Sequence, residues 1–536
     1  MTGLPTGGLP AGGLPQGVPR GDQPDGVAPQ GGTARGNRQG GAGKRPGIGV
    51  ALGKVALALT VAFGGLAAGA GYWQVVRSSD LSSSPDDAAV IAASRHIVRG
   101  EISDREGTRL AWSISDANGE PQRKYLSRAF SGVIGYASPI YGTAGLERAY
   151  QAQLIGITPA DPVQDLVKKF RANASDPQAI RTTLVARLQE AATTALGADR
   201  GAVVMLDPRT GEILALASTP FFDASALADP DTATAMMAAL QADKAKPLLP
   251  RATQGRYVPG SVFKIVTAIA GLGSGAIGPD TTFPEQPPAE KTGLLVDGFR
   301  VRDGHHTVTG TKALDFVEAT EVSCNIWFAL AGLRTGGDAL ASWAGKLGFG
   351  EPIPFDLPTS ASQVTNGGGS FGGGFADAVE LANAAYGQAE TVVTPLQMAL
   401  VASTVANGGV LMKPHLVQQF TGRGGTTTVS PEVWQRILSL DVAQQIGGAM
   451  EQAVNGSLGR GFTTGAQVKG LTVAGKSGTA ELGGTGEPNS WFIGFAPAGD
   501  AQVAIAVVVE QGGRGAERAA PIAGTLLAAW KAWAGQ

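Results

Sequence analysis

The sequence predicts an α+β fold in which one antiparallel sheet is flanked by helices. Apolar runs at residues 202–206 and 212–217 are joined by the turn sequence of residues 207–211, a pattern typical of a β-hairpin. Strand patterns return at residues 471–474, 491–496 and 503–509, and helical stretches fill the chain between these two groups. Because the first and last strands enclose a helical middle, we expect a single sheet with helices packed against it and a closing helix at residues 522–533.

Residues 1–50 are predicted to be a disordered cytoplasmic tail, because they are rich in Gly and Pro and repeat Gly-Leu-Pro at a period of five. Residues 51–76 are predicted to be a transmembrane anchor, since residues 55–76 are apolar, carry no charge and are long enough to span a bilayer as a helix. Basic residues precede this stretch at Arg35, Arg38, Lys44, Arg45 and Lys54, and only Arg77 follows it closely, which puts the rest of the chain outside the cell membrane. A cleaved secretory signal with a site at residues 68–70 is the alternative, and it would export the same residues.

Residues 77–197 are predicted to form a smaller, extended and non-catalytic module, and residues 198–536 the catalytic domain. Within the module we expect two polar helices at residues 163–172 and 179–196, the second of which would end at Gly197.

The composition excludes several classes of function. A net charge of −2 and the lack of a basic stripe argue against nucleic-acid binding. The single cysteine, Cys324, cannot form an intramolecular disulfide. The four histidines show no zinc spacing, and we expect neither a metal nor a cofactor.

The first chemical motif combines a nucleophile and a base. Ser261 and Lys264 are three residues apart in a predicted helix at residues 261–272, so both lie on one face, one turn apart. The residues around them are apolar, and a lysine in an apolar pocket can have its pKa lowered enough to act as a base.

The second motif is Ser323-Cys324-Asn325, which precedes a predicted helix at residues 326–330. Ser323 can relay a proton between Lys264 and a leaving group, and Asn325 can hold a substrate amide, whereas Cys324 is expected to point away from both. A purely structural alternative is that Ser323 caps the helix, a role that is compatible with catalysis.

The third motif, Lys476-Ser477-Gly478-Thr479, is expected on an edge of the sheet that faces the helical part. Its ammonium and hydroxyl groups form a clamp for a carboxylate, and Gly478 leaves room for a substrate backbone. The backbone N–H groups of Ser261 and Thr479 are the candidate oxyanion donors. A second Lys-Thr-Gly sequence at residues 291–293 follows a proline-rich run, which favours a loop, so we prefer Lys476.

These motifs together resemble those of the penicillin-binding proteins, specifically the monofunctional class B transpeptidases. The resemblance covers nearly everything after the predicted anchor, and it extends to residues 257–264, 394–397 and 491–495 in the catalytic part and to residues 99–107 and 142–147 in the module. Glu106 replaces the more usual asparagine and Val262 a common threonine, and neither change touches a chemical role.

The resemblance implies a penicillin-binding transpeptidase fold preceded by a dimerisation or pedestal-type module. It also implies that Ser261 attacks a stem peptide ending in D-Ala-D-Ala, releases the terminal D-Ala and passes the acyl group to a neighbouring amine, and that β-lactams acylate the same serine. Glycan synthesis would then fall to a partner, a polytopic membrane glycosyltransferase. In this family the signatures that contain Asp104 and Glu147 are structural, which argues against a glycosidase.

Two other classes of function remain open at this point. One is a hydrolase with the same three motifs, either a D,D-carboxypeptidase or a β-lactamase-type enzyme. The other is a membrane β-lactam sensor, which should carry a signalling domain on the cytoplasmic side.

Overall fold

The computed structural model describes residues 48–71, 96–116, 119–156, 176–303, 312–458, 463–483 and 486–535. The chain divides into two compact units, Met1–Trp73 and Gln74–Gln536. In the first unit the described residues form one helix, α1 (Ile48–Gly71). Within the described ranges, no helix is both long enough and apolar enough to cross a membrane. Residues 1–47 of the predicted tail, the end of the predicted anchor at residues 72–76 and the predicted helix at residues 163–172 lie outside the described residues. The tail was predicted to be disordered as far as residue 50, but residues 48–50 are helical and begin α1.

The second unit is built around an antiparallel sheet of five strands in the order β15-β16-β17-β7-β8. The chain contributes β7 and β8 before the helical middle and the other three strands after it, so the predicted sheet is confirmed. The strands are β7 (Gly201–Leu206), β8 (Ile213–Thr219), β15 (Ala474–Ala480), β16 (Asn489–Ala496) and β17 (Val503–Val509).

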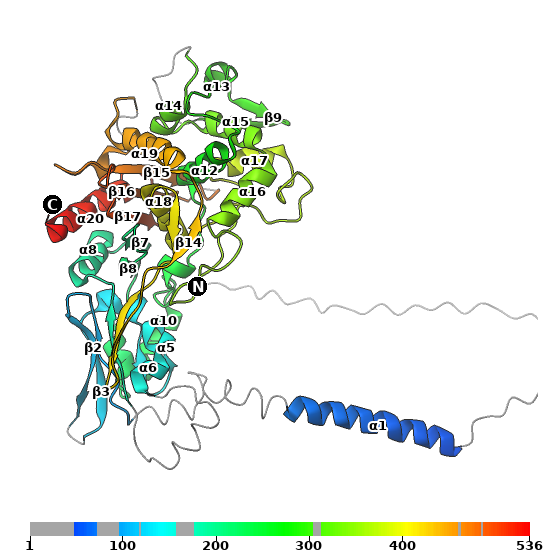
Figure 1. Ribbon diagram of the computed structural model, residues 1–536, viewed down its shortest axis with the longest axis vertical. Coiled ribbons are helices and arrows are strands. Elements are labelled where there is room, and N and C mark those ends of the chain that lie inside the picture. Colours follow the sequence, from blue (N-terminus) through cyan, green and yellow to red (C-terminus); the bar gives the residue numbers. More distant parts are fainter. Residues whose placement is uncertain are drawn as a thin grey trace, which may run out of the picture. The chain divides into compact units, whose positions relative to one another are not determined.

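Helices cover both faces of this sheet, which explains why its strands are apolar on both sides (Figure 1). On one face of the sheet, side chains that include Val203 and Val507 pack with helices α8 (Ala186–Leu196) and α20 (Ala519–Ala534). On the opposite face, side chains that include Val204 and Val508 belong to a larger core with α12 (Lys264–Ser274), α18 (Pro395–Ala406) and α19 (Leu440–Asn455). Alternate residues of each strand thus stabilise opposite layers.

The chain between β8 and β15 is mostly helical, as predicted. Its remaining helices are α9 (Ala224–Ala228), α10 (Ala233–Ala242), α11 (Arg251–Gln254), η3 (Gly260–Phe263), α13 (Gln286–Thr292), α14 (Phe316–Glu321), α15 (Asn325–Thr335), α16 (Gly337–Lys346), α17 (Ala378–Ala384) and η4 (Thr464–Ala466). Two short pairs of antiparallel strands accompany them, β9 (Leu294–Val296) with β10 (Phe299–Val301) and β11 (Val410–Met412) with β14 (Val433–Arg436).

The N-terminal module of the second unit has its own sheet of six strands, in the order β13-β12-β6-β1-β2-β3. Four of them come from the module sequence: β1 (Ile102–Ser103), β2 (Arg109–Ser115), β3 (Pro121–Tyr125) and β6 (Ala179–Thr182). The other two, β12 (Val417–Gly422) and β13 (Gly425–Thr428), come from the distal part of the chain and descend into the module as the yellow hairpin in Figure 1. The small elements η2 (Arg128–Phe130), α4 (Ser131–Ile134), β4 (Ala137–Ser138), β5 (Gly142–Thr143), α5 (Gly145–Ala149) and α6 (Gln151–Ile155) complete it.

Three local predictions are wrong. The helix expected over residues 179–196 begins only at Ala186, because Ala179–Thr182 pairs with β1 and with the distant β12, which the local sequence cannot reveal. The strand expected at residues 471–474 instead runs from Ala474 to Ala480. The proline-rich run before Lys291 begins a helix rather than a loop, since proline is tolerated in the first turn of α13.

Candidate active site

Ser261 lies in the short helix η3, directly before α12, where two close backbone contacts hold it. Gly260 has φ +56 and donates its N–H to the carbonyl oxygen of Gly387 at 2.9 Å. A Cβ on Gly387, whose φ is +86, would lie 1.9 Å from the oxygen of Gly260, so only glycine fits there. The Ser261 side chain itself is partly exposed, as a nucleophile must be.

Lys264 stands one turn further along, and its ammonium group is fully buried. Its Nζ donates to the backbone oxygen of Ser323 at 2.5 Å, to Ser323 Oγ at 3.2 Å and to Asn325 Oδ1 at 2.8 Å. Burial lowers the pKa of Lys264 from 10.5 to about 8, and the negative charge of Asp303 opposes this shift. The predicted pairing of the first and second motifs is therefore present in the structure.

The second motif has an unusual backbone. Ser323 has φ +61, a left-handed conformation that costs a non-glycine residue about 1–3 kcal/mol. Cys324, not Ser323, is the N-cap of α15, and its Sγ accepts the N–H of Trp327 at 3.2 Å. The alternative in which Ser323 caps the helix is thus wrong, and the Ser323 hydroxyl stays available to the lysines.

The third motif lies on β15, the edge strand, as predicted. Lys476 is 1% exposed, and its Nζ donates to Ser323 Oγ at 2.9 Å and to the backbone oxygen of Ser477 at 3.0 Å. Burial, and next the positive charge of Lys264, lower the pKa of Lys476 well below its ordinary value. One hydroxyl group, that of Ser323, therefore lies within hydrogen-bond reach of both buried ammonium groups.

The other members of the third motif line up along the same strand. Ser477 is buried and its Oγ is 3.3 Å from Thr463 Oγ1, whereas Thr479 is exposed and its Oγ1 accepts the N–H of Gly515 at 3.1 Å. Gly478 was expected to admit a substrate backbone. A Cβ there would instead lie 2.9 Å from the oxygen of Pro259, so this glycine first of all lets β15 approach the chain's own nucleophile segment.

A buried polar network that the sequence did not reveal supports the segment before Ser261. Tyr257 donates its hydroxyl to Glu510 Oε1 at 2.9 Å, and Arg251 donates to the same oxygen at 2.7 Å. Trp491 donates its indole N–H to the oxygen of Val258 at 3.0 Å and packs edge-on against Tyr257. Glu510 follows β17 in a charged stretch of sequence, which carries no local signal for this role.

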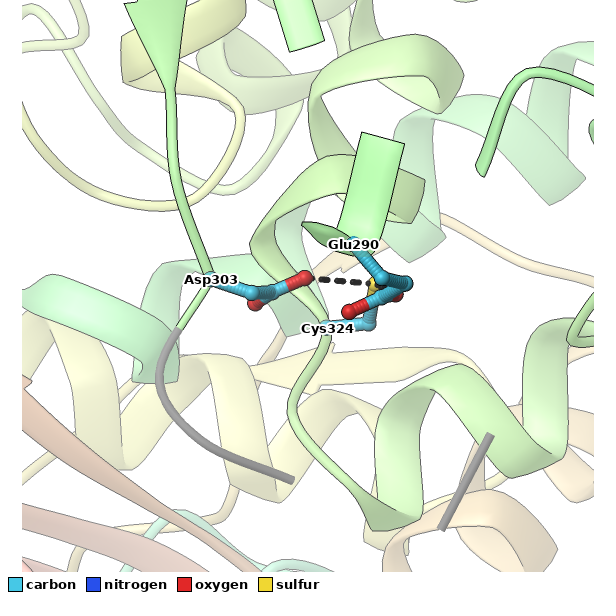
Figure 2. Close-up of side chains that lie close together, drawn as sticks. All are labelled: Glu290, Asp303 and Cys324. Carbon is cyan, nitrogen blue, oxygen red and sulfur yellow. Dashed lines mark hydrogen bonds between the residues drawn. The ribbon is translucent and has the colours of Figure 1, made fainter. Parts of the chain in front are cut away.

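Asp303 is the second residue that sequence reasoning missed. Its carboxylate accepts the N–H of Asn325 at 2.5 Å and that of Ile326 at 3.3 Å, which holds the N-terminus of α15. Figure 2 shows its side chain converging with Cys324 and Glu290, and Cys324 Sγ donates to Asp303 Oδ2 at 2.9 Å. Burial, followed by the charges of Asp303 and Glu290, raises the pKa of the Cys324 thiol, so this cysteine is a poor nucleophile.

Glu290, Asp303 and Cys324 are also the described residues with ligand atoms close enough together to hold a metal ion, all within 4.8 Å of one another. Their thiol and carboxylate contacts already stabilise the start of α15, so the arrangement is explained without an ion.

The remaining sequence candidates are placed away from this chemistry. Lys291 is exposed at the end of α13. Glu147 is fully buried between Arg99 and Arg123, at 2.8 and 2.6 Å. Asp104 accepts the backbone N–H groups of residues 106, 108 and 186. Both carboxylates are therefore bound by groups of the chain itself, as expected for residues with structural roles.

Comparison with known proteins agrees with this geometry. Residues 201–528 match the penicillin binding protein transpeptidase domain, and residues 99–179 match the penicillin binding protein A dimerisation domain. The peptidoglycan D,D-transpeptidase PbpA of Mycolicibacterium smegmatis is 35% identical over 499 residues, which cover 89% of this chain and 98% of the relative. The peptidoglycan D,D-transpeptidase MrdA of Escherichia coli is 29% identical, over 72% of this chain and 63% of the relative.

Solved structures give the same result. The penicillin G acyl-enzyme complex of penicillin-binding protein A from M. tuberculosis superposes with a TM-score of 0.70 at 31% identity, over 81% of this chain and all of that one. Its imipenem acyl-enzyme complex gives a TM-score of 0.71 at 32% identity, over 82% of this chain.

Proposed function

Since the chain belongs to the penicillin-binding protein transpeptidase family, we propose that Ser261 is the acylated nucleophile of a serine-type peptidoglycan D,D-transpeptidase. The observation that carries this assignment is the meeting of three separate motifs on one hydroxyl group. Lys264, which is one helical turn from Ser261, and Lys476 both reach Ser323 Oγ, at 3.2 and 2.9 Å. Such a constellation suits acyl transfer without histidine.

The first half-reaction forms an ester. The Ser261 hydroxyl attacks the penultimate D-Ala carbonyl of a stem peptide, the peptide C–N bond breaks, and the terminal D-Ala leaves as an amine that has gained a proton. Lys264 takes the proton from Ser261, and Ser323 carries a proton toward the leaving amine. Asn325 accepts a hydrogen bond from Lys264 with its oxygen and donates one amide hydrogen to the backbone oxygen of Arg302 at 3.1 Å. Its second amide hydrogen would orient the substrate.

The two buried lysines are best described as a coupled pair. Two ammonium groups that share one hydroxyl in a buried site repel each other. The pair therefore favours the state in which one lysine is protonated and charged and the other is neutral. Asp303 stabilises this proton on Lys264 in the free enzyme. A substrate carboxylate at Lys476 would draw the proton through Ser323 to Lys476, and Lys264 would then be the free base.

The strand β15 supplies the substrate clamp. Lys476 and the hydroxyls of Ser477 and Thr479 would hold the terminal carboxylate, and Gly478 keeps the strand close to the nucleophile segment. The backbone N–H groups of Ser261 and Thr479 would stabilise the oxyanion.

In the second half-reaction an amine of a neighbouring stem peptide attacks the ester, forms the cross-link and frees Ser261. A β-lactam would acylate Ser261 in the same way. Hydrolysis in place of transfer would make the enzyme a carboxypeptidase or a β-lactamase, and the fate of the acyl group separates these alternatives.

The experiment incubates uncross-linked glycan strands that carry pentapeptides with the purified protein and measures both free D-Ala and cross-linked dimers. Transpeptidation predicts that D-Ala release and dimer formation rise together and that penicillin blocks both. Release of D-Ala without dimers would indicate a carboxypeptidase and contradict the proposal.

The cellular arrangement rests on the sequence. We propose a single-pass anchor at residues 51–76 with a cytoplasmic N-terminus and an extracytoplasmic catalytic domain, and a polytopic membrane glycosyltransferase as partner. The support is the uncharged apolar run at residues 55–76 and the basic residues before it. If alkaline carbonate released the native protein from membranes, or if protease added outside the cell spared its catalytic domain, the proposal would be wrong.

A further inference from the structure

A cavity of about 430 Å³ lies in the N-terminal module, between strand β3 and the loop that joins β4 to β5. Its volume is in the range of small-molecule sites, and too small for a folded partner. Figure 1 places β2 and β3 at the end of the second unit opposite α12 and α15, so this cavity is not part of the Ser261 site.

Three polar atoms at this cavity are left without a hydrogen bond. Among the described residues, Arg123 Nη2, Thr143 Oγ1 and Gln151 Oε1 are buried and have no partner. The three residues are 6%, 7% and 6% exposed, and all three line the cavity. Buried polar atoms in proteins are nearly always bonded, so a group that enters the cavity is the natural source of the missing partners.

The identity of these atoms restricts the chemistry of that group. Arg123 Nη2 can only donate and Gln151 Oε1 can only accept, while a threonine hydroxyl can do either. A carboxylate or phosphate would satisfy the arginine and leave the glutamine oxygen unpaired. A secondary amide satisfies both, because its carbonyl accepts from the guanidinium and its N–H donates to Gln151.

The charge around the cavity also argues against an anion. Glu147 already bonds to both Arg99 and Arg123, at 2.8 and 2.6 Å. Asp116 and Glu120 line the same cavity and add negative charge. A neutral ligand is therefore favoured over an acidic one.

We propose that this cavity binds a secondary amide of the uncross-linked wall polymer, away from the site where the chain is acylated. The inference rests on the proposed function, because that substrate carries such amides in two places: the acetamido groups of its amino sugars and the peptide bonds of its stems. Binding there would hold a glycan strand on the module while its stem peptide reaches Ser261.

The test measures binding to the purified chain by isothermal titration calorimetry with two separate probes, N,N′-diacetylchitobiose and a free stem pentapeptide. The variants are Thr143→Val and Gln151→Met. Each removes an unpaired polar atom and keeps the shape, so thermal stability should be unchanged or slightly raised. We expect one probe to bind the wild type and to lose at least tenfold in affinity in both variants.

Thr182→Val is the matched control. Thr182 is buried in the six-stranded sheet of the module, to which Arg123 also belongs, but its hydroxyl donates to the oxygen of Ser103 at 2.9 Å. This variant should lose stability and keep its affinity for the probe. Acylation of Ser261 by fluorescent penicillin should be the same in the wild type and in all three variants. If the wild type itself were not labelled, the catalytic assignment would be wrong, and this result does not depend on the binding measurement.

Binding of the disaccharide alone would assign the cavity to the acetamido group, and binding of the pentapeptide alone to a stem amide. If neither probe bound at millimolar concentration, the cavity would hold only water and the inference would be wrong. Equal affinity in wild type and variants, or a concentration-dependent dimer whose formation is abolished by the same variants, would also overturn it.

Discussion

The pH dependence of acylation follows from the buried lysine pair. In the proposed active form one lysine of the pair is charged and the other is neutral. In the free enzyme the charge is on Lys264, which loses it with a pKa of about 8. The second-order rate constant of acylation by a β-lactam reports on the free enzyme. It should therefore fall above pH 8, to about one tenth at pH 9 and about one hundredth at pH 10. Toward acid it should also fall, as the pair takes up a second proton.

Asp303→Asn moves this profile in a defined direction. The negative charge of Asp303 favours the charged form of Lys264, so its removal lowers the pKa of Lys264 and shifts the alkaline fall to lower pH. The amide oxygen of the variant can still accept the N–H of Asn325, which preserves the start of α15. Asp377→Asn is the control, because it changes a carboxylate that caps a different helix, α17.

The assay follows fluorescent-penicillin labelling over time at pH 5.5–10 for the three proteins. A rate that rises from pH 8 to 10 would refute the reasoning, since it would mean that neutral Lys264 alone suffices and that Lys476 needs no charge. An unchanged pH profile in Asp303→Asn would mean that the charge of Asp303 does not affect the pKa of Lys264, and it would contradict this part of the prediction.

Three further changes have distinct expected effects. Ser323→Ala removes the hydroxyl that joins the two lysines and should slow acylation by about 10²–10⁴-fold, measured by penicillin labelling, with little change in melting temperature; wild-type rates would argue against a relay. Gly387→Ala should abolish labelling because its Cβ would clash with the nucleophile segment, whereas Gly275→Ala, with φ +74 and open space, should cost only stability; similar labelling of the two would contradict the packing argument. Glu510→Gln leaves the buried Arg251 without its counter-charge and should lower the free energy of unfolding in urea by about 3–5 kcal/mol, and a loss below about 1 kcal/mol would show that the pair is solvated.

The sequence predicted the central sheet and the pairing of Ser261 with Lys264 because both depend on short, local patterns. The convergence of Ser323 with Lys264 and Lys476, across 59 and 153 positions, was instead predicted from the chemistry that the three motifs supply together and from their resemblance to a known family. Apolar runs of five to eight residues mark strands covered on both faces, and Ser261 and Lys264 are one turn apart in any helix. It could not predict the six-stranded sheet of the module, because two of its strands come from residues 417–428, more than 200 residues after β6.

The supporting residues of the site were missed for the same reason. Asp303 reaches Asn325 across 22 positions, and Glu510 reaches Tyr257 across 253, so neither contact leaves a local signal. Gly478 was interpreted as room for the substrate, since a sequence does not show which backbone lies opposite a glycine. The left-handed φ of Ser323 was equally hidden, because nothing in the residue type favours it.

The central claim is that Ser261 carries the acyl group and transfers it slowly to water. The most direct measurement is mass spectrometry of the intact protein and of its peptides after an excess of penicillin is added, with the remaining penicillin followed over time. The account predicts one adduct per chain, on the peptide that contains Ser261, which persists long after free penicillin is removed and is absent from Ser261→Ala. An adduct on another residue, or rapid turnover of many equivalents of penicillin, would contradict it.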